Sequence, residues 1–93
     1  MDNNSTHDSE SLPISVSEYQ AVFNIRGLQE KAHQMVMIAK KDEQGGYILE
    51  SDEKAFDQLA HDLSEEIEFK LSPKSKLRHL ARLYHRLRPD DFI

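Results

Sequence analysis

Residues 15–41 form the longest stretch of this 93-residue chain in which the apolar spacing fits a single helix. On a helix of about 3.6 residues per turn, its apolar residues fall on two roughly opposite sides. One side carries Ala21, Ile25, Leu28, Ala32, Met35, Val36 and Ala39, and the other carries Tyr19, Val22, Phe23 and Met37. A helix that is apolar on two sides needs two partners, because either side left in water loses its burial energy. We therefore expect one side to pack within the chain and the other to be covered by the chain or by a second molecule.

The start of this helix carries a recognisable signal. Ser15 followed three residues later by Glu18 is a capping-box pattern, in which each side chain accepts a hydrogen bond from the other residue's backbone N–H. Gly27 is a weak point, because a glycine in a helix interior costs about 1 kcal/mol relative to alanine. A close helix crossing would explain that glycine, and a kink is the alternative. The sequence predicts one helix over about 16–41.

Two further helical patterns are expected to form a hairpin. In the range 52–70, apolar residues recur at spacings of three and four along one stripe, which is typical of an amphipathic helix. The range 73–88 begins with Pro73, which suits the first turn of a helix, and the proline that follows the range ends it. The apolar run 47–49 lies between the predicted helices 16–41 and 52–70 and has no second strand pattern to pair with. We therefore expect it to be an extended connector.

The first fourteen residues are almost entirely polar. Such a segment buries too little apolar surface to offset the entropy lost on ordering. We therefore expect 1–14 to be a disordered acidic and polar tail and 15–93 to be a single domain. The fold class predicted from the sequence is all-α, a small three-helix domain made of one long helix and a helical hairpin.

The sequence offers little catalytic or metal-binding chemistry. It contains no cysteine, no glycine-rich phosphate loop and no Gly-x-Ser-x-Gly elbow, so nucleophilic and nucleotide-dependent enzymes lack their signatures. Asp57, His61 and Glu65 are spaced four apart, but this row lies opposite the apolar stripe of its helix, so we interpret it as solvent-facing. We expect a non-enzymatic protein without cofactor, metal or small-molecule substrate. No apolar run spans a bilayer and no signal peptide begins the chain, so we expect a cytoplasmic protein without a membrane partner.

Charge is distributed unevenly along the chain. The formal net charge is −5, yet 42–68 holds ten acids and one base, whereas 73–88 holds six bases, two histidines and no acid. The predicted third helix therefore has a basic outer face, made of Arg78, His79, Arg82, His85 and Arg86. That face is either simply solvated or docks an acidic partner or nucleic acid. It lacks the Asn and Gln side chains that read base edges.

The sequence favours a protein-interaction or regulatory module: an adaptor, an inhibitor or an antitoxin-like partner. The predicted contact residues are Tyr19, Val22, Phe23 and Met37, because large apolar side chains dominate interface energetics. A homodimer through these residues would bury them without any other partner, and coverage by the third helix within one chain is the alternative. The alternative function is nucleic-acid binding through the basic helix 73–88.

Overall fold

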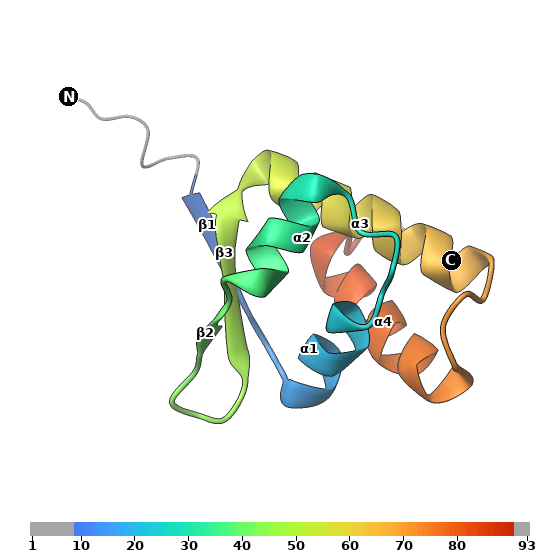
Figure 1. Ribbon diagram of the computed structural model, residues 1–93, viewed down its shortest axis with the longest axis horizontal. Helices are drawn as coiled ribbons and strands as arrows, with labels where there is room; N and C mark the ends of the chain where they lie inside the picture. The colour runs from blue at the N-terminus through green and yellow to red at the C-terminus, as the bar shows by residue number, and fades with distance from the viewer. Residues whose placement is uncertain (1–8, 91–93) are drawn as a thin grey trace.

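The structure, a computed structural model, describes residues 9–90 and shows a mixed α/β domain (Figure 1). Its elements in chain order are β1 (Ser9–Ile14), α1 (Val16–Phe23), α2 (Glu30–Met37), β2 (Lys40–Lys41), β3 (Tyr47–Asp52), α3 (Glu53–Glu68) and α4 (Lys74–Leu87). The three strands form one antiparallel sheet in the order β1-β3-β2. The prediction of an all-α three-helix domain is therefore wrong.

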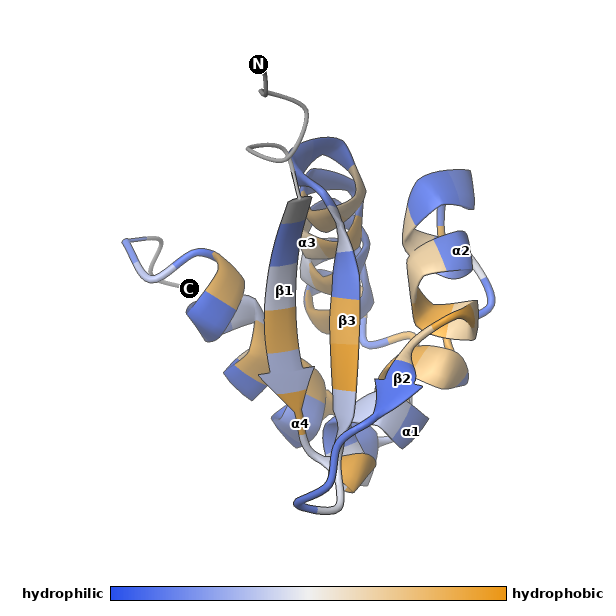
Figure 2. Ribbon diagram, turned by 90° about the vertical axis from the view of Figure 1, so that its left-hand side faces the viewer, coloured by the Kyte–Doolittle hydropathy of each residue, from blue (hydrophilic) through white to orange (hydrophobic). Residues whose placement is uncertain are grey.

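The sheet packs one face against the helices. In the β1–β3 register, Leu12 lies opposite Leu49 and Ile14 lies opposite Tyr47. Because alternate residues of a strand point to opposite faces, these four side chains share one face of the sheet. Figure 2 shows α3 running behind the strands, with α2 on one side of it and α4 on the other.

All three strands occupy segments for which the sequence predicted none, and Lys40–Lys41, expected to end the helix over 16–41, form β2. Residues 9–14, expected to belong to a disordered tail, form β1, while residues 1–8 lie outside the described part of the chain. Residues 47–49, expected to be a connector, belong to β3, which pairs with β1 on one side and β2 on the other. β1 has few apolar residues, and its hydrogen-bonding partner β3 lies far away in the sequence. A local pattern therefore could not reveal β1. β3 also pairs with β2 as a short hairpin, and the glycines Gly45 and Gly46 between them were an available local signal.

The predicted single helix over 16–41 is in fact two helices, α1 and α2, separated by residues 24–29. α1 ends at Asn24, whose side-chain amide donates to the backbone carbonyl of Gln20 at 2.7 Å. The break lets α1 pack against α4 while α2 packs against α3. It thereby buries apolar residues from both sides of the predicted helix, including Ala21, Val22, Ala32 and Met35. The two apolar sides of the predicted helix reflect this break, because α1 and α2 pack in different directions.

α3 and α4 closely match the predicted helices 52–70 and 73–88. Leucines from both helices and from β3 form the centre of the core, and Leu49, Leu59, Leu63, Leu80 and Leu83 are fully buried. Within the part of the chain that the structure describes, no helix combines the length and the apolar character needed to cross a membrane.

Candidate protein-binding surface

An aromatic cluster lies where α1 meets β3 and the end of α2. The ring of Tyr19 stacks on Tyr47, with centroids 3.8 Å apart, and on Phe23, with centroids 5.8 Å apart. The Tyr19 hydroxyl lies 3.5 Å from the backbone carbonyl oxygen of Val36, a distance at which a hydrogen bond is weak. Tyr19 therefore links α1 to both β3 and α2.

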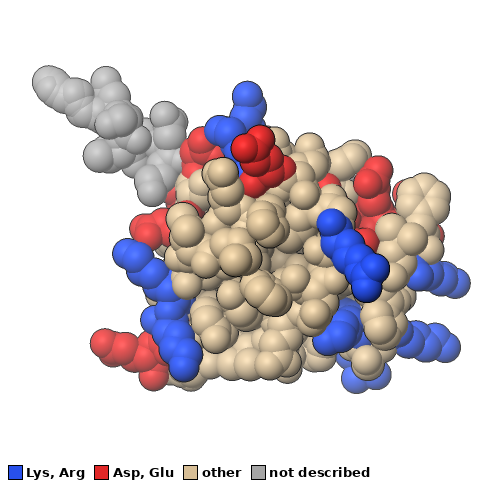
Figure 3. Space-filling view, in the orientation of Figure 1, with Lys and Arg blue, Asp and Glu red and all other residues tan. Residues whose placement is uncertain are grey.

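Three large apolar side chains around this cluster are exposed. Phe23 is 50% exposed, and Met37 and Ile38, which directly follow Val36, are 54% and 68% exposed. We call Tyr19, Phe23, Met37 and Ile38 the α1–α2 apolar surface. In the orientation in which α1 and α2 face the viewer, Figure 3 shows a broad area free of charged side chains, with Lys, Arg, Asp and Glu gathered at its margins.

The capping box predicted from the sequence sets the orientation of α1. The Ser15 N–H donates to Glu18 Oε1 at 2.9 Å, and the Glu18 N–H donates to Ser15 Oγ at 3.1 Å. Glu18 is buried, and its Oε1 also lies 3.3 Å from Nη1 of Arg86 on α4. These contacts fix the helix so that Val22 points into the core and Phe23 points outward.

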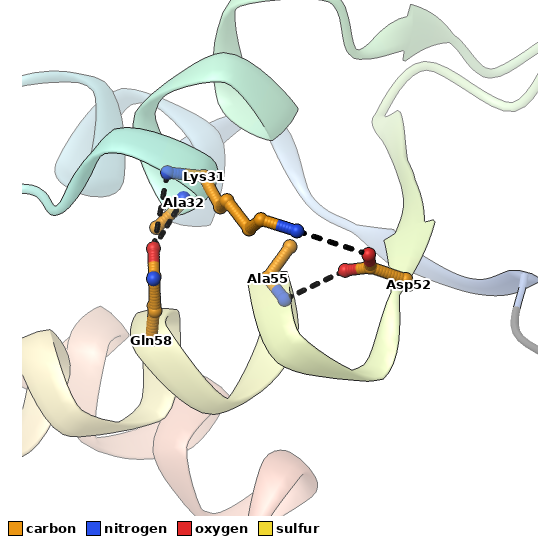
Figure 4. A network of polar contacts seen from close by, with 5 residues as sticks. All are labelled: Lys31, Ala32, Asp52, Ala55 and Gln58. Atoms are coloured by element: carbon orange, nitrogen blue, oxygen red, sulfur yellow. Dashed lines mark hydrogen bonds and ion pairs between the residues drawn. The ribbon is translucent and has the colours of Figure 1, made fainter.

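Side chains of α3 cap the first turn of α2, which has no side-chain cap of its own. Gln58 Oε1 accepts from the backbone N–H groups of Lys31 and Ala32 at 3.0 and 3.3 Å (Figure 4). Asp62, one turn further along α3, accepts from the backbone N–H of Gln29 at 2.8 Å. The N-terminal N–H groups of a helix have no partners within the helix. The contacts from Gln58 and Asp62 therefore determine where α2 begins and how its far end presents Met37.

Asp52 connects the first turn of α2 to the start of α3 (Figure 4). Its Oδ1 accepts from the Ala55 N–H at 2.9 Å, which caps α3, and its Oδ2 lies 3.3 Å from Lys31 Nζ. The hydrogen bond from the Ala55 backbone N–H, followed by the neighbouring lysine, lowers the pKa of Asp52 below its usual value. The carboxylate thus joins β3, α3 and α2 at one corner.

The predicted contact residues differ in their positions. Phe23 and Met37 lie exposed on the α1–α2 apolar surface, and Tyr19 is half-buried beneath it. Val22 is fully buried, so it is a core residue and is unavailable to a partner. The sequence interpretation missed Ile38, which lies just past the end of α2 as its C-cap residue. The available signal was a large apolar residue two positions before the lysine pair Lys40–Lys41.

The basic face predicted on α4 is smaller than expected. Arg86 is a structural residue, because its Nη1 pairs with Glu18 and its Nη2 donates to the Pro13 carbonyl oxygen at 2.5 Å. His79 is partly buried, and its Nδ1 has no hydrogen-bond partner among the described residues. Arg78, Arg82 and His85 are exposed.

The acidic row on α3 makes local contacts. Asp57 Oδ1 pairs with Nη2 of Arg88 at 2.5 Å, and His61 Nε2 lies 3.4 Å from Glu65 Oε2. Over residues 9–90, no group of three or more potential ligand side chains is arranged to hold a metal ion. The positions of these residues fit the interpretation of a solvent-facing helix surface.

A hollow of about 640 Å³ lies between residues 24–27 and the α3–α4 turn and is bordered by the buried Glu66. Glu66 is only 7% exposed there, and its Oε1 accepts from the hydroxyl of Ser72. This contact closes the turn between α3 and α4, so we interpret Glu66 as a structural residue.

Comparison of the chain with protein-family models gave no match, and comparisons with curated proteins and with solved structures gave none either.

Proposed function

We propose that the chain is a non-enzymatic protein-binding module, that the α1–α2 apolar surface is its binding surface, and that two copies associate through it. One observation carries this proposal. Phe23, Met37 and Ile38 are each at least half exposed, Phe23 stacks on Tyr19, and the Tyr19 hydroxyl lies beside the carbonyl of Val36, the residue before Met37.

The chemistry of this surface suits a protein partner. Exposed aromatic side chains and methionine are enriched at the centres of protein interfaces, where they act as anchors, and charged residues gather at the rim. The charge-free area with charged margins in Figure 3 has this arrangement. Stacking of Phe23 on Tyr19 also restrains its ring before binding, which reduces the entropy lost on association.

A second copy of the chain is the partner we favour. The same surface on two copies can pair about a twofold axis, which is the commonest symmetry of soluble oligomers. A stable interface buries about 800 Å² on each partner, and four side chains supply only part of that area. We therefore expect a weak dimer, with a Kd of roughly 10–100 μM.

The proposal can be tested by sedimentation velocity from low micromolar to several hundred micromolar protein. The wild type should show a concentration-dependent shift from monomer to dimer. The variant Phe23→Asp/Met37→Asp should stay monomeric while its circular dichroism spectrum remains that of the folded chain, since both side chains are exposed.

Phe69 and Leu71 provide a matched control, because they are 62% and 64% exposed and lie in the α3–α4 turn. The variant Phe69→Asp/Leu71→Asp makes the same change in charge and hydrophobicity away from the proposed surface, and it should dimerise as the wild type does. A wild type that is monomeric at every concentration, or a control variant that loses dimerisation equally, would contradict the proposal.

A further inference from the structure

The outer face of α4 carries a row of basic side chains, three of them permanently charged. Lys74, Arg78, Arg82 and His85 follow one another at spacings of four, four and three, so they share one side of the helix. All four are exposed. We call them the α4 cationic stripe, which extends over about 16 Å at 1.5 Å per residue.

The stripe has no ion-pair partner among residues 9–90. The ion pairs that α4 does form come from Arg86 and Arg88, which engage Glu18 of α1 and Asp57 of α3. The range 73–88 contains no acid. Glu18 and Asp57 are thus paired with Arg86 and Arg88 and not with the stripe.

The stripe also lacks apolar anchors. The large hydrophobic side chains that are exposed in the described chain all lie outside α4. A protein partner would find cations there but no aromatic or aliphatic side chain of the kind that dominates protein interfaces. A nucleic-acid backbone needs only cations that neutralise phosphates. The chemistry of the face therefore favours a phosphodiester chain over an acidic protein.

We propose that the α4 cationic stripe binds the phosphate backbone of nucleic acid without sequence preference. Successive cations are about 6 Å apart along the helix axis, whereas one DNA strand presents a phosphate for about every 3.4 Å of its own axis. Each cation can therefore meet roughly every second phosphate. The stripe has no Asn or Gln and no Phe, Tyr or Trp, so it lacks the amide side chains that read adenine edges and the large aromatic rings on which successive bases stack.

The net charge of −5 does not prevent this contact. At physiological ionic strength the screening length is about 8 Å, so acids on the far side of the domain act weakly on a phosphate that touches α4. Figure 2 places α2 and α4 on opposite sides of α3. The α4 cationic stripe shares no residue with the α1–α2 apolar surface, so different substitutions test the two proposals and either can fail without the other.

Fluorescence anisotropy with a labelled DNA duplex of mixed sequence tests the proposal. Three permanent cations give a slope of about −2.7 for log K against log salt, so raising the salt threefold should weaken binding roughly twentyfold. The variant Arg78→Ala/Arg82→Ala should bind at least about tenfold more weakly at low salt. The control variant Lys41→Ala/Lys54→Ala removes two exposed cations elsewhere, and it should stay within about twofold of the wild type.

Three results would overturn the proposal. The first is no binding of the duplex at low salt. The second is an equal loss in both double variants, which would indicate an effect of net charge alone. The third is binding of poly-glutamate, through the same arginines, as tightly as the duplex, which would assign the stripe to an acidic protein. The Phe23→Asp/Met37→Asp variant should bind the duplex as the wild type does, which keeps this test independent of dimerisation.

Discussion

Arg86 and Arg82 lie on the same helix, but the structure gives them different roles. Replacing each by alanine should therefore change the stability of the fold by different amounts. Arg86 bonds to the buried Glu18 carboxylate and to the Pro13 carbonyl oxygen, so it ties α4 to α1 and β1. Arg82 is exposed and has no ion pair within residues 9–90. We predict that Arg86→Ala destabilises the fold and that Arg82→Ala does not.

The size of the effect follows from the two contacts. A hydrogen bond to a charged group contributes about 1.5–3 kcal/mol, but the Arg86 side chain is 37% exposed, so solvent screening reduces the Glu18 contact to about 1 kcal/mol. The bond to the Pro13 carbonyl adds about 1 kcal/mol. We therefore expect Arg86→Ala to lower the free energy of unfolding by about 2 kcal/mol. For a domain of this size, this corresponds to a fall in Tm of roughly 8–16 °C.

Thermal unfolding followed by circular dichroism at 222 nm measures this difference. Arg82→Ala serves as the control and should change the free energy of unfolding by no more than about 0.5 kcal/mol. Glu18→Gln keeps an oxygen to accept from the Ser15 N–H and removes the charge, so a double-mutant cycle with Arg86→Ala isolates the ion pair. If Arg86→Ala unfolds at the same temperature as Arg82→Ala, the assignment of Arg86 as a structural residue is wrong.

Three further predictions concern the elements that support the surface. Asp62→Ala removes the buried carboxylate that caps α2 and should destabilise the fold by about 2 kcal/mol in urea unfolding, whereas the exposed Glu65→Ala should change stability by less than about 0.5 kcal/mol. Gly46→Ala would place a Cβ 2.2 Å from a backbone oxygen of β1 and should lower the Tm strongly, while Gly27→Ala meets open space and should leave it unchanged or raise it slightly. The pKa of Asp52 is lowered mainly by its bond to a backbone N–H, so its stabilising contribution is present above the unfolded pKa of about 3.9 and is lost as pH falls through the folded pKa. The Tm deficit of Asp52→Asn should therefore be present at neutral pH and disappear in strong acid, and a deficit that is the same at every pH would contradict this reasoning.

The sequence was most informative where a structural element is determined by its own residues. The Ser15–Glu18 capping box lies where it was predicted, because both partners are three residues apart on one chain segment. α3 and α4 carry long, regular apolar stripes, and their positions follow the stripes. Local signals of this kind need no knowledge of the rest of the fold.

The elements that the sequence did not reveal depend on distant partners. α2 begins where Gln58 and Asp62 of α3 cap its N–H groups, so no residue near Gln29 signals the new helix start. β1 and β3 stabilise each other across the intervening helices, and neither segment has a clear alternating pattern alone. Val22 is buried in α1, which packs against α4, so for this residue the alternative of coverage within one chain is the correct one.

Part of the candidate surface was nevertheless predictable. Tyr19, Phe23 and Met37 were grouped on one side of a helix; in the structure Tyr19 stacks on Phe23, its hydroxyl lies beside the carbonyl of Val36, the residue before Met37, and Phe23 and Met37 are exposed. Ile38 and the support from Tyr47 were not predictable, because both depend on where α2 ends and on the strand that follows.

The most direct test of the central claim is a dilution series of ¹⁵N–¹H correlation spectra of the wild-type chain. If two copies associate through the α1–α2 apolar surface, the concentration-dependent shift changes should be confined to the amides of Tyr19, Phe23, Met37, Ile38 and their immediate neighbours. Spectra that are identical at all concentrations, or shift changes centred on another face of the domain, would contradict the account.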